Sequence, residues 1–297
     1  MHKSGFVNII GNPNVGKSTL MNAMVGERMS IITAKPQTTR HRIVGILSGD
    51  DFQIIFSDTP GIIKKPVYKM QEAMNRFVKS TFEDADLMLF VTEVKEKYSE
   101  DDPIFDQLKN LTVPKFLVIN KIDISDPDAV VKLIQWWNER IEFNETIPLS
   151  ALEKKNTETL LKLVQDNLQE GPAYYPKDQL TDRPERFFVS EIIREKILEL
   201  YHQEIPYSTE VHVESFKETK TNDDKPLVKI YAIIFVARET QKMIVLGKGG
   251  SAIKKLGMES RKALEKWLES KVFLELHVKV KDNWRDDERQ LRHFGYE

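Results

Sequence analysis

Residues 11–18 are Gly11-Asn12-Pro13-Asn14-Val15-Gly16-Lys17-Ser18, which match the motif G-x-x-x-x-G-K-[ST] at every fixed position. The apolar run 6–10 before them predicts a buried strand, and residues 18–25 after them predict a helix. In this context the loop amides would point at phosphates, Lys17 would contact the β- and γ-phosphates, and Ser18 would offer its hydroxyl to Mg²⁺. An ordinary glycine-rich turn is the alternative, because the fixed positions recur by chance in about 1% of chains this long.

Composition describes an ordinary globular chain without a bias toward one class of partner. The 297 residues are enough for two domains, each with its own core. The 44 basic residues nearly balance the 46 acidic ones, which excludes a wholly basic nucleic-acid coat but not a local basic patch. The lack of cysteine excludes disulfides and thiolate metal sites, and the six histidines show no metal-ligand spacing. No apolar run approaches the ~20 residues that span a bilayer, so we expect a cytoplasmic protein.

The first half of the chain alternates apolar runs with segments of helical periodicity. The apolar runs lie at residues 43–47, 52–56, 87–91, 116–119 and 146–149. This alternation predicts an α/β domain with a mixed, mostly parallel sheet and flanking helices. Only residues 48–51 separate the first two runs, which predicts a hairpin and therefore one antiparallel strand. Ligands of such sheets bind at the carboxyl ends of the strands.

A D-x-x-G motif, Asp58-Thr59-Pro60-Gly61, follows the predicted strand 52–56. Its carboxylate could hold Mg²⁺ through water, and its glycine N–H would lie near a γ-phosphate. Alone, this motif is more often just a turn. Its place some forty residues after a phosphate loop favours the functional interpretation.

A guanine pocket is predicted after the strands 116–119 and 146–149. In Asn120-Lys121-Ile122-Asp123, the Asp123 carboxylate can accept hydrogen bonds from N1–H and the amino group of guanine, a donor pair that adenine lacks. Asn120 and Lys121 would brace the pocket and pack on the base. Ser150-Ala151 could present a backbone N–H to guanine O6, a role that the order of the motifs suggests although Ser-Ala alone means nothing.

These motifs, in this order and spacing, resemble those of the translation-factor-like GTPases of the P-loop class over residues 5–168. The resemblance implies GTP and GDP as ligands and Mg²⁺ as cofactor. It also implies a mobile switch threonine in the polar segment 36–40, with Thr39 favoured, Thr38 as the alternative, and a plain solvated loop as the other possibility. The metal ligands would be Ser18, Thr39 and Asp58, and the catalytic residues would be Lys17, Thr39, Gly61 and Asn14. The implied nucleotide contacts are Gly11, Asn12, Pro13, Asn14, Val15, Gly16, Lys17, Ser18, Thr19, Asp58, Thr59, Pro60, Gly61, Ile62, Asn120, Lys121, Asp123, Ser150, Ala151 and Leu152.

One position departs from the small signalling GTPases, which carry a water-orienting glutamine directly after D-x-x-G. This chain has Ile62 there, which can orient nothing, so we expect slow intrinsic hydrolysis. The chain is similar in this respect to GTPases with an apolar residue at that position. Some of them recruit K⁺ through an asparagine of the phosphate loop, which Asn14 matches. K⁺ is therefore a further candidate cofactor.

The second half begins after residues 171–185, a stretch with three prolines and little periodicity that predicts a linker between domains at 1–170 and 186–297. Periodicity then predicts a helix at 185–202, strands at 209–216 and 227–238 with a polar hairpin loop at 217–226, helices at 240–246 and 251–268, and a strand at 272–280. This order, with Gly247-Lys248-Gly249-Gly250 between the two central helices, resembles the α+β KH domain of type II, the prokaryotic arrangement. The resemblance implies that the G-x-x-G loop clamps about four nucleotides of single-stranded RNA. A helix-ending turn is the alternative for an isolated G-x-x-G.

Positive charge gathers beside this loop. Residues 242–266 contain seven basic residues and two acidic ones, a surplus that would attract phosphates in a salt-dependent way. Lysines at such spacing also occur on solvated helix faces, which is the alternative. The expected RNA contacts are Gly247, Lys248, Gly249, Gly250, Lys242, Lys254, Lys255 and Arg261.

A P-loop GTPase followed directly by a KH domain resembles the Era-type family of bacterial GTPases, and the stretches 36–42, 180–186 and 282–285 support the match. The resemblance implies a switch that binds and hydrolyses GTP, binds small-subunit (16S) ribosomal RNA near its 3′ end, and assists assembly of the 30S subunit. It also implies loose peripheral association with the inner membrane, and we expect a monomer. Two rival hypotheses are an RNA-binding module with an incidental GTPase half and a membrane-surface signalling GTPase.

Overall fold

The computed structural model describes residues 2–296, which form two compact units. The first unit contains the residues up to Lys64 together with Met74–Asp182. The second contains Lys65–Ala73 and the residues from Arg183 onward. The boundary after Asp182 falls within the stretch 171–185, where a linker is expected. No sequence pattern assigns Lys65–Ala73 to the second unit.

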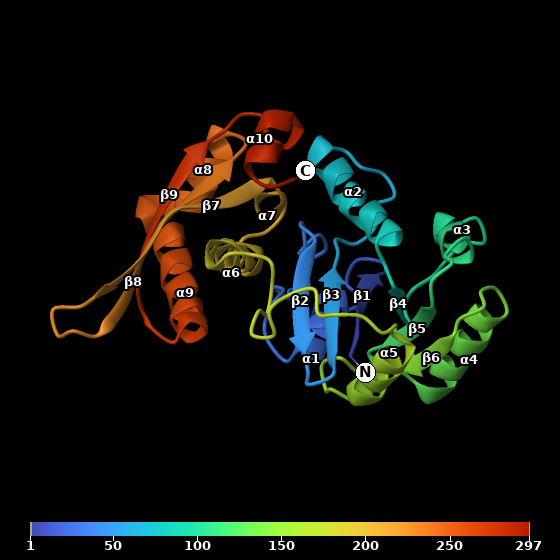
Figure 1. Ribbon diagram of the computed structural model, residues 1–297. Helices are drawn as coiled ribbons and strands as arrows, with labels where there is room; N and C mark the ends of the chain where they lie inside the picture. The colour runs from blue at the N-terminus through green and yellow to red at the C-terminus, as the bar shows by residue number, and fades with distance from the viewer. Residues whose placement is uncertain (1, 297) are drawn as a thin grey trace. The chain divides into compact units, whose positions relative to one another are not determined.

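A six-stranded sheet forms the centre of the first unit, in the order β2-β3-β1-β4-β5-β6 (Figure 1). β2 runs antiparallel to β3, as the predicted hairpin requires, and the other neighbouring strands are parallel. Residues 87–91 of β4 are at most 1% exposed, so both faces of the sheet are covered. The strands are β1 (Lys3–Ile10), β2 (Ile43–Ser48), β3 (Phe52–Asp58), β4 (Leu87–Glu93), β5 (Lys115–Asn120) and β6 (Glu145–Pro148).

Helices with local start and stop signals cover this sheet. α1 ends before Gly26, whose φ of 84° takes the chain out of the helix. α3 begins at Pro103, after Asp102 accepts a hydrogen bond from the Ile104 N–H at 3.2 Å. The helices are α1 (Lys17–Val25), α2 (Lys69–Glu83), α3 (Pro103–Lys109), the 3₁₀ turn η1 (Ile122–Ile124), α4 (Pro127–Asn138) and α5 (Thr157–Asn167).

The segment 171–182 lies along the edge of the first unit, so most of the predicted linker is not a free connection. The Ile46 N–H of β2 donates to the Leu180 carbonyl at 2.8 Å, and the Thr181 hydroxyl donates to the Val44 carbonyl at 2.7 Å. Gln53 of β3 donates to the Tyr175 carbonyl at 2.8 Å. An extended, proline-containing segment satisfies the outer backbone groups of edge strand β2, which composition alone does not reveal.

The second unit has a three-stranded sheet in the order β7-β8-β9, with β7 antiparallel and β9 parallel to β8. Alternate β8 residues, from Val228 to Val236, join a buried core with side chains from helices α6, α8 and α9. The elements are α6 (Glu185–Leu200), α7 (Ile205–Ser208), β7 (Thr209–Lys220), β8 (Pro226–Val236), α8 (Glu239–Leu246), η2 (Lys248–Gly250), α9 (Ser251–Leu268), β9 (Lys271–Val280), η3 (Trp284–Asp286) and α10 (Glu288–His293).

The hairpin and the C-terminal segment differ from expectation. β7 extends to Lys220 and β8 starts at Pro226, so the predicted loop 217–226 shrinks to residues 221–225. The short helices α7 and α10 were not predicted, because four and six residues carry too little periodicity. Trp284 is fully buried and donates from Nε1 to the Ser208 carbonyl at 3.0 Å, which holds the C-terminal segment against α7.

Candidate functional site

The glycines of the phosphate loop allow close approaches that a side chain would block. A Cβ at Gly16 would lie 2.3 Å from Asn120 Nδ2, and one at Gly11 would lie 2.2 Å from the Val91 carbonyl oxygen. Both residues also have positive φ angles, 97° at Gly16 and 148° at Gly11. The loop therefore packs against the ends of β4 and β5, which places its amides at the carboxyl edge of the sheet.

Lys17 is buried at the mouth of this loop. Its ammonium group donates to the carbonyl oxygens of Gly11 at 2.9 Å and Asn12 at 2.8 Å. Burial lowers the pKa of Lys17 from 10.5 to about 8, opposed by the nearby Asp58 and Glu96 carboxylates. A buried ammonium group with two neutral acceptors would gain strongly from an arriving phosphate.

The three predicted metal ligands lie together. The Ser18 hydroxyl donates to Asp58 Oδ2 at 2.6 Å and lies 2.9 Å from Thr39 Oγ1, which is 3.3 Å from the same Asp58 oxygen. Thr38, the alternative to Thr39, instead donates to the Lys35 carbonyl and contacts the Thr33 hydroxyl, each at 2.7 Å. The structure therefore places Thr39, not Thr38, at the predicted metal site.

This donor set suits Mg²⁺. Asp58 is fully buried, and its Oδ1 has no hydrogen-bond partner among the described residues. Burial is the main reason that the pKa of Asp58 is raised. Mg²⁺ would be held by the Ser18 and Thr39 hydroxyl groups and by the Asp58 carboxylate, directly or through water. Within residues 2–296 no cluster of three or more His, Cys, Asp or Glu side chains offers another metal site.

The D-x-x-G turn is held against the phosphate loop. Thr59 Oγ1 donates to the Ile9 carbonyl at 2.9 Å, and a Cβ on Gly61 would lie 2.6 Å from the Pro13 ring. Ile62 packs on the hydrophobic cluster around Phe90 and does not line the cavity. Its side chain therefore cannot orient a water there, in line with the expectation of slow intrinsic hydrolysis.

Asn120 braces the base pocket as predicted. Its Nδ2 donates to the Val15 carbonyl at 2.9 Å, and its Oδ1 accepts from the N–H groups of Lys121 at 2.8 Å and Ala151 at 3.0 Å. Ser150-Ala151 is predicted to present a backbone N–H to guanine O6, and in this structure the Ala151 N–H is directed at Asn120 Oδ1. The Ser150 N–H also has a partner, the Lys155 carbonyl at 3.1 Å. Ser150 and the exposed Leu152 are the predicted residues of this loop that line the pocket.

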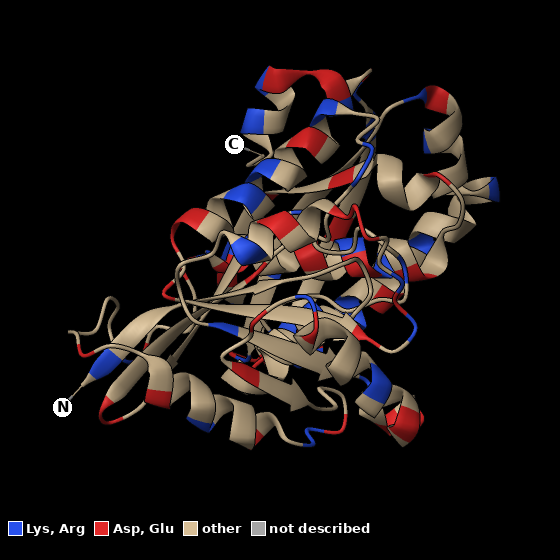
Figure 2. Ribbon diagram, turned by 90° about the vertical axis from the view of Figure 1, so that its right-hand side faces the viewer, with Lys and Arg blue, Asp and Glu red and all other residues tan. Residues whose placement is uncertain are grey.

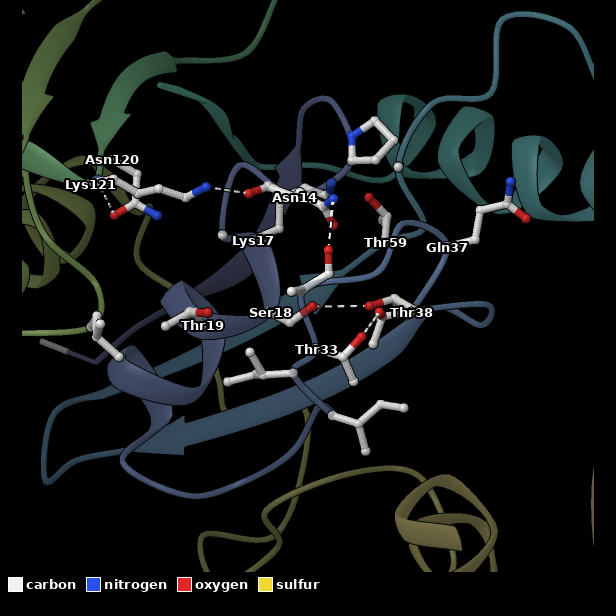
Figure 3. A pocket seen from close by; sticks show the side chains of 18 of the residues that line it. Asn14, Lys17, Ser18, Thr19, Thr33, Gln37, Thr38, Thr59, Asn120 and Lys121 are labelled. Carbon is white, nitrogen blue, oxygen red and sulfur yellow. Dashed lines mark hydrogen bonds between the residues drawn. The ribbon is translucent and has the colours of Figure 1, made fainter. Parts of the chain in front are cut away.

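One cavity of about 470 Å³ brings most predicted nucleotide contacts together. Figure 3 shows Lys17, Ser18 and Thr59 at this cavity, with Asn120 and Lys121 at one end and Gln37 at the other. Seven predicted contacts do not line this cavity: Gly11, Asn12, Val15, Asp58, Pro60, Ile62 and Ala151. Sequence reasoning missed further lining residues, which carry no motif: Ile31, Ile32, Thr33, Ala34, Gln37 and Ile124.

Asn14 lies at the rim of the same cavity. It is exposed, has a φ of 67°, and donates from Nδ2 to the Ala34 carbonyl at 3.3 Å. Its backbone carbonyl accepts from Lys121 Nζ at 2.6 Å (Figure 3). Its side-chain oxygen has no partner among the described residues, so it is available to a cation.

A second hollow, of about 340 Å³, lies in the second unit between α9 and β9. Lys254 and Arg261 provide positive charge at this groove, and its apolar lining comes from Ile253, Met258, Leu274 and Leu276. Gly257 keeps it open, since the nearest atom to a Cβ there, Leu276 Cδ1, lies 3.9 Å away. Basic and acidic residues both occur along the helices of the molecule (Figure 2). An apolar floor with a basic rim suits bases and phosphates of a single strand.

The G-x-x-G loop stands at the start of α9. Gly247, Gly249 and Gly250 all have positive φ angles, and a Cβ on Gly249 or Gly250 would meet no atom within 4 Å. The exposed Lys248 lies in this loop, and Lys255 is exposed on α9. Lys242 instead pairs with Glu239 at 3.4 Å. The loop backbone is therefore open to a close approach by a sugar-phosphate chain.

Comparison with known proteins agrees with both sites. A family model described as "50S ribosome-binding GTPase" matches residues 6–121, and one described as "KH domain" matches residues 204–285. The fold and sites thus define a P-loop GTPase joined to a KH domain. GTPase Era of Staphylococcus haemolyticus is 46% identical over 99% of this chain and 97% of its own length, and that of Clostridium kluyveri is 46% identical over the full length of both. The chain belongs to the Era family of GTPases, and it hydrolyses GTP.

Solved structures give the same result. A crystal structure of Era from Aquifex aeolicus bound to GDP and AlF₄⁻ has a TM-score of 0.91 and 38% identity, and covers 99% of both chains. An Era complex with MgGDPNP and nucleotides 1506–1542 of 16S ribosomal RNA has a TM-score of 0.92 and 38% identity, and covers 100% of this chain and 99% of the other. In this chain, no helix within residues 2–296 has the length and apolar character of a membrane span.

Proposed function

We propose that this protein is a GTP-driven switch that binds the 3′ end of small-subunit ribosomal RNA and assists assembly of the small ribosomal subunit. The observation that carries the proposal is the pairing of a Ser18–Thr39–Asp58 metal site with a basic, apolar groove on α9 and β9 in one chain. The Era relative solved with MgGDPNP and 16S RNA supports it. Bound Mg²⁺ would shield the phosphate charges, while Lys17 would hold the β- and γ-phosphates.

The test is RNA binding in three nucleotide states. We expect RNA from the 16S 3′ end to bind with clearly different affinity in the presence of a GTP analogue, GDP and no nucleotide, because ordering of the loop around Thr39 would change the RNA-binding unit. Filter binding measures this. Lys17→Met should remove the difference between states and keep the affinity of the nucleotide-free form. An RNA affinity that ignores nucleotide would instead favour the scaffold hypothesis.

We also propose that K⁺ binds beside Asn14 and supplies positive charge during hydrolysis. The partner-free side-chain oxygen of Asn14 at the cavity rim and the absence of a polar side chain at Ile62 support this. GTP hydrolysis should be several-fold faster in KCl than in NaCl, and Asn14→Ala should remove that difference. Equal rates of the unaltered protein in the two salts would exclude the proposal.

Cytoplasmic location, peripheral membrane association and a monomeric state are further proposals that fractionation and sedimentation would test.

A further inference from the structure

The two faces of the β7-β8-β9 sheet differ in what they carry. Even-numbered residues of β8 and β9, such as Ile230 and Leu274, face the helices of the second unit. Odd-numbered residues therefore point to the opposite side, because side chains alternate along a strand. The strand register brings a set of these residues side by side, and we call the set the outer face: Lys217, Lys229, Tyr231, Lys271, Phe273, Glu275 and His277.

One exposed aromatic ring and a half-buried ring pair lie on this outer face. Phe273 is 56% exposed, although it lies within strand β9. The rings of Tyr231 and His277 stack with centroids 4.8 Å apart and planes 28° apart. Exposing a phenyl ring costs solvation free energy without a folding benefit, and a planar ring pair offers a flat surface to another ring.

Three lysines lie on the same face as these rings, together with one acidic residue, Glu275, whose carboxylate lies 2.8 Å from His277 Nε2. In the strand register Lys217 lies opposite Lys229, and Lys229 lies beside Phe273. Within residues 2–296, none of these lysines, Lys217, Lys229 and Lys271, forms an ion pair. Like charges directly opposite on neighbouring strands destabilise a sheet. An anion lying across them would relieve that repulsion.

The outer face borders the RNA groove through a shared strand. Leu274 and Leu276 of β9 line the groove, whereas Glu275 between them and Phe273 and His277 on either side point to the outer face. β9 is also the edge of the sheet, so a chain can pass from one side to the other around it. The other end of the face is covered, since Phe294 packs on Phe235 with ring centroids 5.4 Å apart.

We propose that the outer face is a second RNA subsite, on which bases that leave the groove stack while Lys217 and Lys229 contact their phosphates. Stacking on open aromatic rings with basic residues between them is how single strands are held without strict sequence readout. The inference rests on the RNA binding proposed above. It adds a position for the nucleotides beyond the roughly four that the groove holds.

The test compares RNA lengths on the full chain with a GTP analogue bound. Fluorescence anisotropy would measure the affinity for an RNA of about four nucleotides from the 16S 3′ end. It would also measure the affinities for two longer RNAs, one extended by about four nucleotides at the 5′ end and one at the 3′ end. We expect one of the longer RNAs to bind roughly tenfold more tightly or better. Phe273→Ala should remove most of that gain and leave the affinity for the short RNA unchanged. Val131→Ala, on α4 with 52% exposure, is the matched control and should change neither value.

A charge variant gives an independent readout. Lys229→Thr should weaken binding of the longer RNA and lower the slope of log affinity against log salt concentration by about one. It should also raise the midpoint of thermal unfolding of the RNA-free protein, because the repulsion between Lys217 and Lys229 is gone. A loss of RNA affinity together with a gain in stability cannot come from a damaged fold. The proposal is wrong if neither extension tightens binding, or if the gain survives both variants. Failure of the unaltered protein to bind even the short RNA would instead refute the RNA function itself, and this inference with it.

Discussion

At the scale of single residues, the buried Lys17 ammonium group lowers the folding stability of the nucleotide-free protein. Its pKa falls from 10.5 to about 8 through burial. Between these pH values the unfolded chain holds a proton that the folded chain has released, so stability rises with pH across this window. Below pH 8 the buried ammonium group costs about 3 kcal/mol, at 1.36 kcal/mol for each pKa unit. A bound triphosphate would offset that cost.

We therefore predict that Lys17→Met stabilises the nucleotide-free protein at pH 7 by about 1–3 kcal/mol, because an apolar side chain of similar length carries no charge into the site. This advantage should shrink as the pH rises from 8 toward 10, while GTP binding is lost at every pH. Urea unfolding at pH 7 and pH 9.5 measures it, with Lys132→Met on the exposed side of α4 as the control. A variant less stable than the unaltered protein at pH 7 would show that the hydrogen bonds of Lys17 outweigh its burial.

At the scale of elements, long periodic segments were predictable from the sequence. Short segments, and contacts between residues far apart in the chain, were not. The predicted helix 251–268 is found as α9 with the same bounds, since its apolar period is uniform and glycines precede it. Residues 217–220 extend β7 although they are polar, because backbone pairing to β8 requires no apolar side chain. The motifs located the nucleotide site, but the Ala151–Asn120 hydrogen bond joins residues 31 apart and no local pattern encodes it.

The G-x-x-G loop carries a prediction of its own. Gly249 has a φ of 60° and open space around its Cβ position, so Gly249→Asp should cost only about 1–2 kcal/mol of stability. Its carboxylate would repel the RNA backbone, so we expect at least a tenfold loss of RNA affinity and unchanged GTP hydrolysis without RNA. Anisotropy and phosphate release measure the two effects. Asn222→Asp, which adds the same charge on the exposed 221–225 hairpin, should leave RNA affinity nearly intact. Equal losses in both variants would mean that only net charge matters.

At the scale of the whole molecule, residues 65–73 offer a route for coupling between nucleotide and RNA. They follow Gly61 of the D-x-x-G turn within a few positions, yet they belong to the unit that contains the KH domain. There the Arg285 guanidinium lies 3.8 Å from the centroid of the Tyr68 ring, and the Lys69 N–H donates to Asp286 at 3.1 Å. Lys69 Nζ also pairs with Glu288 at 2.9 Å. The turn is therefore joined covalently to residues 65–73, and these residues contact the C-terminal segment.

Arg285→Ala should weaken this coupling, because it removes a cation–π contact worth about 0.5–2 kcal/mol while leaving the residues of both ligand sites in place. Reciprocity requires that saturating RNA changes the affinity for a GTP analogue by the same factor as the analogue changes the affinity for RNA. Calorimetric titrations of each ligand, with and without the other, give both factors. In Arg285→Ala both coupling factors should move toward a value of one by about the same amount. Arg289→Ala, on the exposed side of α10, should leave both factors unchanged. Unaltered factors in Arg285→Ala would show that the coupling takes another path, and factors of one in the unaltered protein would show that no coupling exists.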